Sequence, residues 1–168
     1  MCSLRKTKSN KKKSGQTQPL KTTHRRLLMN NGEKMIEVIY TCAFVDTKAL
    51  EQQLMEHGVV RKKLQREIRD MHVTLEFRPE EVDESLFGTP VDIRVVGYGV
   101  NRQNEGLLVE VSCAEKKVQE LCEKVKVPHI TLSVSKDGKP VNTRYVEFAP
   151  ISSPFSIQGV YGAVRFRR

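Results

Sequence analysis

Two short motifs in this chain carry side chains suited to acid–base chemistry. The sequence HVTL contains His72 and Thr74, and the sequence HITL contains His129 and Thr131. Successive residues of a β-strand point to opposite faces, so in each motif the histidine and the threonine share one face, about 7 Å apart along the chain. The apolar residues of each motif occupy the other face and can anchor the strand in a core. The alternative is that both pairs only decorate the solvent faces of two amphipathic strands.

Two such pairs facing one another could open a cyclic phosphodiester. The reaction needs a base that takes a proton from attacking water and an acid that gives a proton to the departing ribose oxygen. Imidazole, with an ordinary pKa near 6.5, can do either at neutral pH. Each threonine hydroxyl can donate to a non-bridging phosphate oxygen. The near-symmetric motifs leave open which histidine is the base, and this scheme requires no metal or other cofactor.

The two motifs resemble the paired H-x-T-x signatures of the 2H phosphoesterase superfamily. That superfamily includes bacterial and tRNA-ligase-associated 2′,3′-cyclic phosphodiesterases, and enzymes that cleave 2′,5′-oligoadenylates, ADP-ribose cyclic phosphates or cyclic oligonucleotide signals. The resemblance covers roughly residues 35–166. It implies a bilobal α+β fold with two antiparallel-sheet lobes, helices outside and a central cleft. It also implies that His72 and His129 are the acid–base pair and that Thr74 and Thr131 bind phosphate.

The hydrophobic pattern predicts the elements that position the motifs. Strands rich in apolar and β-branched residues are expected at 35–44, 71–77, 91–100, 107–111, 128–134 and 157–166. The segment 97–99, Gly-Tyr-Gly, suggests a bulge or a close backbone approach. The order, β-α-β followed by β-β-α-β-β, indicates an α+β domain with two related lobes.

The helices are predicted from their capping residues. Asp46 is a plausible N-cap for a helix that stops at Gly58. A capping box, Ser112-x-x-Glu115, is expected to open a second helix with an apolar stripe. The charged segment 61–70 has Leu and Ile spaced four apart and is expected to form one or two exposed helical turns.

The net charge of +9 comes entirely from the N-terminus. Residues 1–26 contain nine of the 29 Lys and Arg residues and no acid, so the other 20 basic residues balance the 20 acidic ones. We expect a disordered basic tail over 1–26 and a single 2H phosphoesterase-like domain over 27–168. The tail could contact nucleic acid, act as a nuclear address, or only confer solubility.

Four further residues are candidates for substrate binding. Tyr161 and Tyr98 could stack on a base, and Arg165 and Lys136 could meet a phosphate. Each has a structural alternative. Tyr161 can be a partly buried tyrosine beside a surface arginine, Tyr98 an ordinary bulge residue, and Lys136 a solvated lysine in a turn.

These observations favour a metal-independent phosphodiesterase acting on nucleotide or RNA-terminal 2′,3′-cyclic phosphates. The alternatives are an enzyme degrading 2′,5′-linked or cyclic oligonucleotide signals, and a non-catalytic nucleotide- or RNA-binding module. No apolar stretch approaches the ~20 residues of a membrane span, and no signal peptide or Cys-x-x-Cys pair is present, so an intracellular location, nuclear or cytoplasmic, is expected. We expect a monomer without metal, cofactor or membrane contact, whose partner is an RNA end or small nucleotide.

Overall fold

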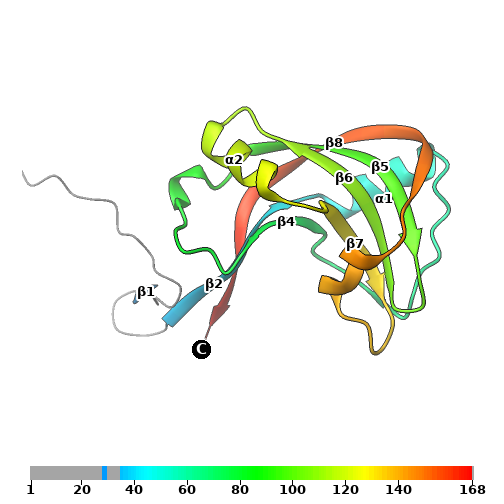
Figure 1. Cartoon of the computed structure of the whole chain (residues 1–168), viewed down its shortest axis with the longest axis horizontal. Coiled ribbons are helices and arrows are strands. Elements are labelled where there is room, and N and C mark those ends of the chain that lie inside the picture. The colour runs from blue at the N-terminus through cyan, green and yellow to red at the C-terminus, as the bar shows by residue number, and fades with distance from the viewer. Residues whose placement is uncertain (1–27, 30–34, 168) are drawn as a thin grey trace, which may run out of the picture.

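The structure is a computed structural model, and it describes residues 28–29 and 35–167. The predicted tail over 1–26 therefore lies outside the described residues. A closed antiparallel ring of six strands forms the body of the protein (Figure 1). In spatial order these strands are β2 (Met35–Phe44), β4 (His72–Phe77), β7 (His129–Val134), β6 (Asn104–Ser112), β5 (Pro90–Val100) and β8 (Ala149–Arg167). The sequence predicts an α+β class, and the structure confirms a mixture of helices and antiparallel strands.

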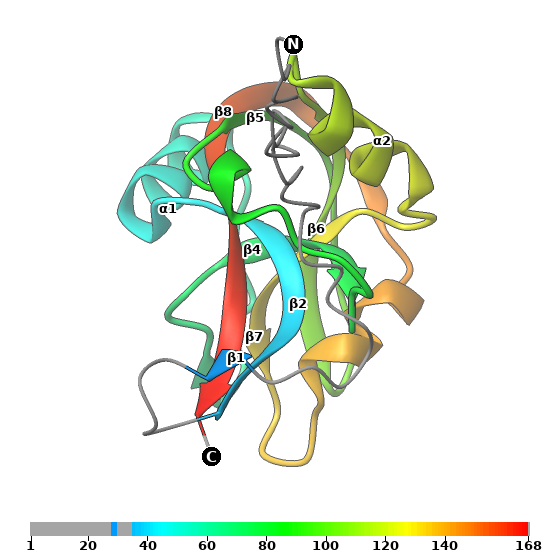
Figure 2. The same cartoon turned by 90° about the vertical axis from the view of Figure 1, so that its left-hand side faces the viewer.

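Two further strands of two residues each and four helical segments make up the rest of the described secondary structure. β1 (Leu28–Met29) pairs with β2, and β3 (Arg66–Glu67) pairs with β7. The helices α1 and α2 lie on different sides of the barrel, outside the ring (Figure 2). The helical segments are α1 (Thr47–Glu56), α2 (Lys116–Lys124) and the short 3₁₀ helices η1 (Glu84–Leu86) and η2 (Pro140–Tyr145). The two 3₁₀ helices have no counterpart among the predicted elements.

The first predicted helix is confirmed together with its caps. The side chain of Asp46 accepts a hydrogen bond of 2.8 Å from the backbone N–H of Ala49, as an N-cap does. Gly58, just beyond the helix, has φ of +74°, a conformation that glycine adopts without steric cost. Leu50 and Leu54 are buried and attach α1 to the core.

The second helix begins three residues later than the predicted capping box requires. Ser112 is the last residue of β6, and the N-cap is Glu115, whose carboxylate accepts 2.8 Å from the N–H of Val118. The helix α2 therefore starts at Lys116, and the Ser112-x-x-Glu115 interpretation is wrong. The predicted apolar stripe is present, with Val118 and Cys122 buried.

The segment 61–70 is extended rather than helical, so this prediction is also wrong. Its backbone bonds to β7 instead of to itself: the N–H of Leu64 donates to the Ser133 hydroxyl, and the N–H of Ile68 donates to the Leu132 carbonyl, both at 3.0 Å. Because these long-range bonds satisfy the backbone, the weak helical spacing of the apolar residues does not decide the conformation.

Two features of the sheet bear on its closure. The bulge predicted near 97–99 appears as a register shift between Val95 and Gly97. A Cβ at Gly99 would lie 2.6 Å from the carbonyl oxygen of Glu147, so glycine permits the close approach of the chain. β8 is much longer than the predicted strand. Its pairing changes from β5 to β2 around Val160, which pairs with both Pro90 of β5 and Phe44 of β2.

The apolar faces of the ring strands and the inner faces of both helices share one core. It includes Val73 and Leu75 of β4 and Ile130 and Leu132 of β7, which are the anchoring residues of the two motifs. Among the described residues, no helix is long and apolar enough to cross a membrane.

Candidate active site

The two histidine motifs lie on neighbouring strands of the ring. β4 and β7 run antiparallel, and Val73 pairs directly with Ile130. Because the strands run antiparallel, His72 and Thr131 lie to one side of this pair along the strands, and Thr74 and His129 lie to the other. Val73 and Ile130 are both completely buried, so the four motif residues next to them lie on the opposite face of the sheet. The four side chains line one cavity of about 1230 Å³, so the structure brings together all four predicted catalytic residues.

Each imidazole is held in the same way by its own strand. Nδ1 of His72 lies 2.7 Å from the carbonyl oxygen of Asp70, and Nδ1 of His129 lies 2.8 Å from that of Val127. A carbonyl oxygen only accepts hydrogen bonds, so both Nδ1 atoms carry the proton. In the neutral imidazole Nε2 is then unprotonated, and it is the atom that can exchange a proton with a bound molecule.

Burial lowers the pKa of both imidazoles below the ordinary value of 6.5. For His72 the positive charge of His129 lowers the pKa further, whereas the hydrogen bond to the carbonyl and the charge of Asp70 act in the opposite direction. For His129 the hydrogen bond to the Val127 carbonyl raises the pKa, whereas the positive charge of Arg144 lowers it further. A bound phosphate brings negative charge into the cavity, which favours protonation of an imidazole.

The two halves of the site differ in what surrounds the motif residues. The ring of His72 stacks on Tyr40, with centroids 5.0 Å apart and planes 24° apart, and meets the edge of Phe44. On the other side, the hydroxyl of Thr131 lies 2.8 Å from that of Thr143 and donates to the carbonyl of Pro140 at 3.2 Å. In the described part of the chain the Thr74 hydroxyl makes no hydrogen bond.

The cavity wall also carries an excess of positive charge that the two motifs do not indicate. Four cationic residues and two acidic ones line it: Arg69, Lys124, Lys126, Arg144, Glu67 and Asp70. Their types are common on any protein surface, and only the fold brings these segments to one cavity. The excess favours an anionic ligand.

Two aromatic side chains at the cavity are unusually exposed. Phe77, the last residue of β4, is 63% exposed, and Tyr145, the last residue of η2, is 68% exposed. The guanidinium of Arg144 lies 4.7 Å from the centroid of the Tyr145 ring. Exposed rings beside cationic groups are suited to stacking on nucleobases. The sequence predicts this role for Tyr98 and Tyr161 instead.

Tyr161 and Arg165 do not lie at the cavity. The Tyr161 side chain is 3% exposed and packs in the core against Phe87, and burial raises its pKa. Arg165 forms an ion pair of 2.6 Å with Glu84. Both lie on the face of β8 opposite Val164, and Val164 is the residue of that strand that lines the cavity. The Tyr161 side chain is therefore buried more completely than the structural alternative, a partly buried tyrosine, supposes.

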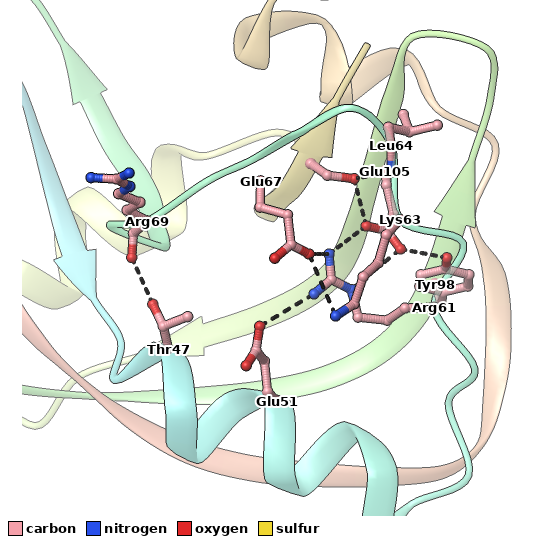
Figure 3. Close-up of polar contacts among 10 residues, drawn as sticks. Thr47, Glu51, Arg61, Lys63, Leu64, Glu67, Arg69, Tyr98 and Glu105 are labelled. Atoms are coloured by element: carbon pink, nitrogen blue, oxygen red, sulfur yellow. Dashed lines mark hydrogen bonds and ion pairs between the residues drawn. The ribbon is translucent and has the colours of Figure 1, made fainter.

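Tyr98 and Lys136 are also placed elsewhere. The Tyr98 hydroxyl donates to Glu105 at 2.7 Å (Figure 3). It also accepts from the backbone N–H of Lys62 at 2.8 Å. Burial raises the pKa of Tyr98 to about 12, and the hydrogen bond to Glu105 adds to this effect. Lys136 is exposed in the turn after β7 and does not line the cavity.

The partner of Tyr98 belongs to a buried ion-pair cluster behind the site. Glu105 is completely buried and binds Arg61 at 2.6 Å, and its carboxylate also accepts from the Ser133 hydroxyl at 2.7 Å. Arg61 reaches Glu67 at 3.1 Å and Glu51 at 3.4 Å as well (Figure 3). Because Ser133 belongs to β7 and Glu67 lines the cavity, this cluster fixes the wall of the site.

Searches against models of protein families and against curated proteins find no match to this sequence. Across residues 28–29 and 35–167 no group of three His, Cys, Asp or Glu side chains is arranged to hold a metal ion. The site thus offers two imidazoles with free Nε2 atoms, two hydroxyls and a cationic rim.

Proposed function

We propose that this protein is a metal-independent phosphodiesterase of the 2H phosphoesterase type that hydrolyses nucleotide or RNA-terminal 2′,3′-cyclic phosphates. The observation that carries the proposal is the antiparallel pairing of the two motif strands about Val73 and Ile130. This pairing relates the motifs by an approximate two-fold axis and gives each side of a bound phosphate one imidazole and one hydroxyl. The matching Nδ1 contacts, which leave both Nε2 atoms available, support it.

The reaction would use one histidine in each protonation state. The neutral imidazole takes a proton at Nε2 from water, whose oxygen forms the new bond to phosphorus. The protonated imidazole gives its Nε2 proton to the ribose oxygen as that oxygen's bond to phosphorus breaks. Thr74 and Thr131 donate to the non-bridging oxygens, and the cationic rim offsets the charge of the phosphate.

The strand arrangement supports two lobes within the single ring. One proposed lobe contains β2, β4 and the second half of β8, and the other contains β5, β6, β7 and the first half of β8. Between β4 and β7 the lobes meet through a single residue pair. The cleft of the proposed phosphoesterase fold would be the cavity over that seam.

A second substrate class is favoured by the extent of the cavity. Its lining continues past the four motif residues at both ends of the seam. At one end are Phe77 and the segment 124–127, and at the other are the segments 67–70 and 140–141. The volume exceeds the roughly 300–1,000 Å³ of common small-ligand pockets. Room on both sides of the phosphate suits a diester joining two nucleosides, such as a 2′,5′ linkage.

A substrate panel tests the proposal and separates the two classes. Purified protein would be incubated with 2′,3′-cyclic mononucleotides, oligonucleotides ending in a cyclic phosphate, 2′,5′-oligoadenylates and cyclic dinucleotides, and the products identified. We expect a product monoester from at least one cyclic phosphate. Hydrolysis of the 2′,5′ linkage alone would favour the second class, whereas binding without turnover of any member would favour a nucleotide-binding module. RNA ends as substrates would place the reaction in the cytoplasm or nucleus.

A further inference from the structure

A chain of buried polar side chains lies directly behind Thr131. The Thr143 side chain of η2 is completely buried, and its hydroxyl oxygen lies 2.8 Å from that of Thr131. Asn104, the first residue of β6, is 1% exposed and donates from Nδ2 to Thr143 Oγ1 at 3.0 Å. The same amide donates to the carbonyl of Lys139 at 2.8 Å.

The numbers of donors and acceptors determine which residue donates in each of these hydrogen bonds. Both N–H bonds of the Asn104 amide are used, one by Lys139 and one by Thr143. Thr143 therefore accepts from Asn104, and its own single proton needs an acceptor that is within reach and out of water. The Thr131 oxygen at 2.8 Å meets this need. A hydroxyl proton rotates to suit its partners, so satisfying the buried Thr143 requires it to donate to Thr131.

This direction leaves the Thr131 proton free for the ligand. When Thr131 accepts from Thr143, its own proton can go only to the Pro140 carbonyl or into the cavity. The Pro140 contact is long, at 3.2 Å. A charged phosphate oxygen is a stronger acceptor than a neutral carbonyl, and a donor that is itself polarised by an upstream bond is strengthened. Thr74 has no such support, since its hydroxyl makes no hydrogen bond within the described chain.

The backbone around Thr131 is built to admit this arrangement. Gly106 of β6 lies opposite Thr131 in the register. A Cβ at this position would come 2.3 Å from Cγ2 of Thr143 and 2.9 Å from the carbonyl oxygen of Ile130. The absence of a side chain at Gly106 therefore lets η2 pack closely enough for Thr143 to reach Thr131.

We propose that Asn104 and Thr143 are positioning residues that aim the Thr131 hydroxyl proton at one non-bridging oxygen of the substrate phosphate. The inference rests on the proposed function, because it concerns a residue of the same site. It adds an asymmetry that the two motifs do not contain: the Thr131 side of the site is preset, whereas the Thr74 side adapts to the ligand.

The test compares Thr143→Val and Thr143→Ser in the wild-type and Thr131→Val backgrounds. Valine keeps the shape and removes the hydroxyl, whereas serine keeps the hydroxyl. Losing one direct transition-state donor costs about 10²–10³-fold, so Thr143→Val, acting through Thr131, should lower kcat/KM about 10-fold. Thr143→Ser should retain nearly full activity, and in the Thr131→Val background Thr143→Val should have no further effect. An equal loss in both backgrounds would overturn the proposal.

A stereochemical readout separates aiming from simple packing. The two phosphorothioate diastereomers of a 2′,3′-cyclic nucleotide replace one or the other non-bridging oxygen with sulfur. Wild-type protein should prefer one diastereomer, and Thr143→Val should reduce that preference, whereas a packing defect would slow both equally. Should Thr143→Val fail to fold, Asn104→Asp provides the second variant. A carboxylate at position 104 accepts the Thr143 proton, so Thr143 can no longer donate that proton to Thr131. Its preference should fall likewise, and an unchanged preference would contradict the proposal.

A binding measurement tests the positioning role of Thr143 even if the protein has no phosphodiesterase activity. If wild-type protein hydrolyses no panel member, the dissociation constant of 3′-AMP, measured by calorimetry, replaces kcat/KM in the same four-variant comparison. Thr143→Val should then weaken 3′-AMP binding several-fold only where Thr131 is present. Weakening in both backgrounds, or in neither, would refute the positioning role, whatever the outcome for catalysis.

Discussion

Replacing Arg61 with methionine should destabilise the fold strongly, because it leaves a buried carboxylate without its charged partner. The Arg61 side chain is 7% exposed and that of Glu105 is 0% exposed. Their closest atoms are 2.6 Å apart, and a second contact of 3.3 Å joins Nε of Arg61 to the other carboxylate oxygen. After the substitution Glu105 keeps only its hydroxyl partners, Tyr98 and Ser133.

The expected magnitude follows from the cost of an uncompensated buried charge. Removing one member of a buried ion pair costs about 3–5 kcal/mol, and methionine retains most of the packing volume, so cavity formation adds little. Arg61→Met should therefore lower the free energy of unfolding by about that amount. The matched control is Lys63→Met, since Lys63 is 61% exposed and approaches Glu67 only to 3.9 Å. An exposed pair of this kind contributes about 0–1 kcal/mol.

Urea denaturation at pH 7, followed by circular dichroism, measures both variants. Adding Glu105→Gln to Arg61→Met removes the orphaned charge, so the double variant should be more stable than Arg61→Met alone. A loss below about 1 kcal/mol for Arg61→Met, or a double variant no more stable than the single one, would refute the assignment of Arg61 and Glu105 as a buried pair that fixes the cavity wall.

Further predictions concern the site and its support. Because burial lowers the pKa of His72 and His129, the bell-shaped profile of kcat/KM should have both limbs below pH 6.5, and an alkaline limb above pH 7 would contradict this. The unfolded chain binds these protons more readily, so the free energy of unfolding should fall as pH drops below 6.5. Arg144→Gln should raise the pKa of His129 and shift one limb of the profile to higher pH, whereas Arg94→Gln, at an exposed pair with Glu110, should not. Gly106→Ala should lower the free energy of unfolding by about 1–3 kcal/mol, measured by urea denaturation, because its Cβ would overlap Thr143.

The sequence was sufficient to predict elements whose signals are local. The period-two alternation of the motif strands and the capping by Asp46 and Gly58 each depend on neighbouring residues, and the structure confirms them. The motif residues could be named for the same reason. That β4 and β7 are adjacent, and that Val73 pairs with Ile130, depends on contacts far apart in the chain, which alternation alone does not specify.

The errors have long-range causes. The segment around Arg61 has helical spacing, but Glu105, 44 residues away, and hydrogen bonds to β7 hold it extended. The position of Tyr98 between two glycines suggests a role in base stacking, but its hydroxyl donates to Glu105 instead. The cationic residues of the cavity wall come from three segments, and only the closed ring gathers them. The N-cap of α2 is Glu115 rather than Ser112, because Ser112 is still part of β6.

Turnover by histidine variants tests the central claim most directly. His72→Ala and His129→Ala would be assayed on the best substrate of the panel beside His57→Ala, a control whose ring stacks on Phe155 outside the cavity. An acid–base pair predicts that each site variant loses about 10²–10⁴-fold in kcat with its fold intact. The double variant should lose far less than the product of the two losses, and His57→Ala should stay near wild type. Near wild-type turnover in either His72→Ala or His129→Ala would contradict the two-histidine mechanism.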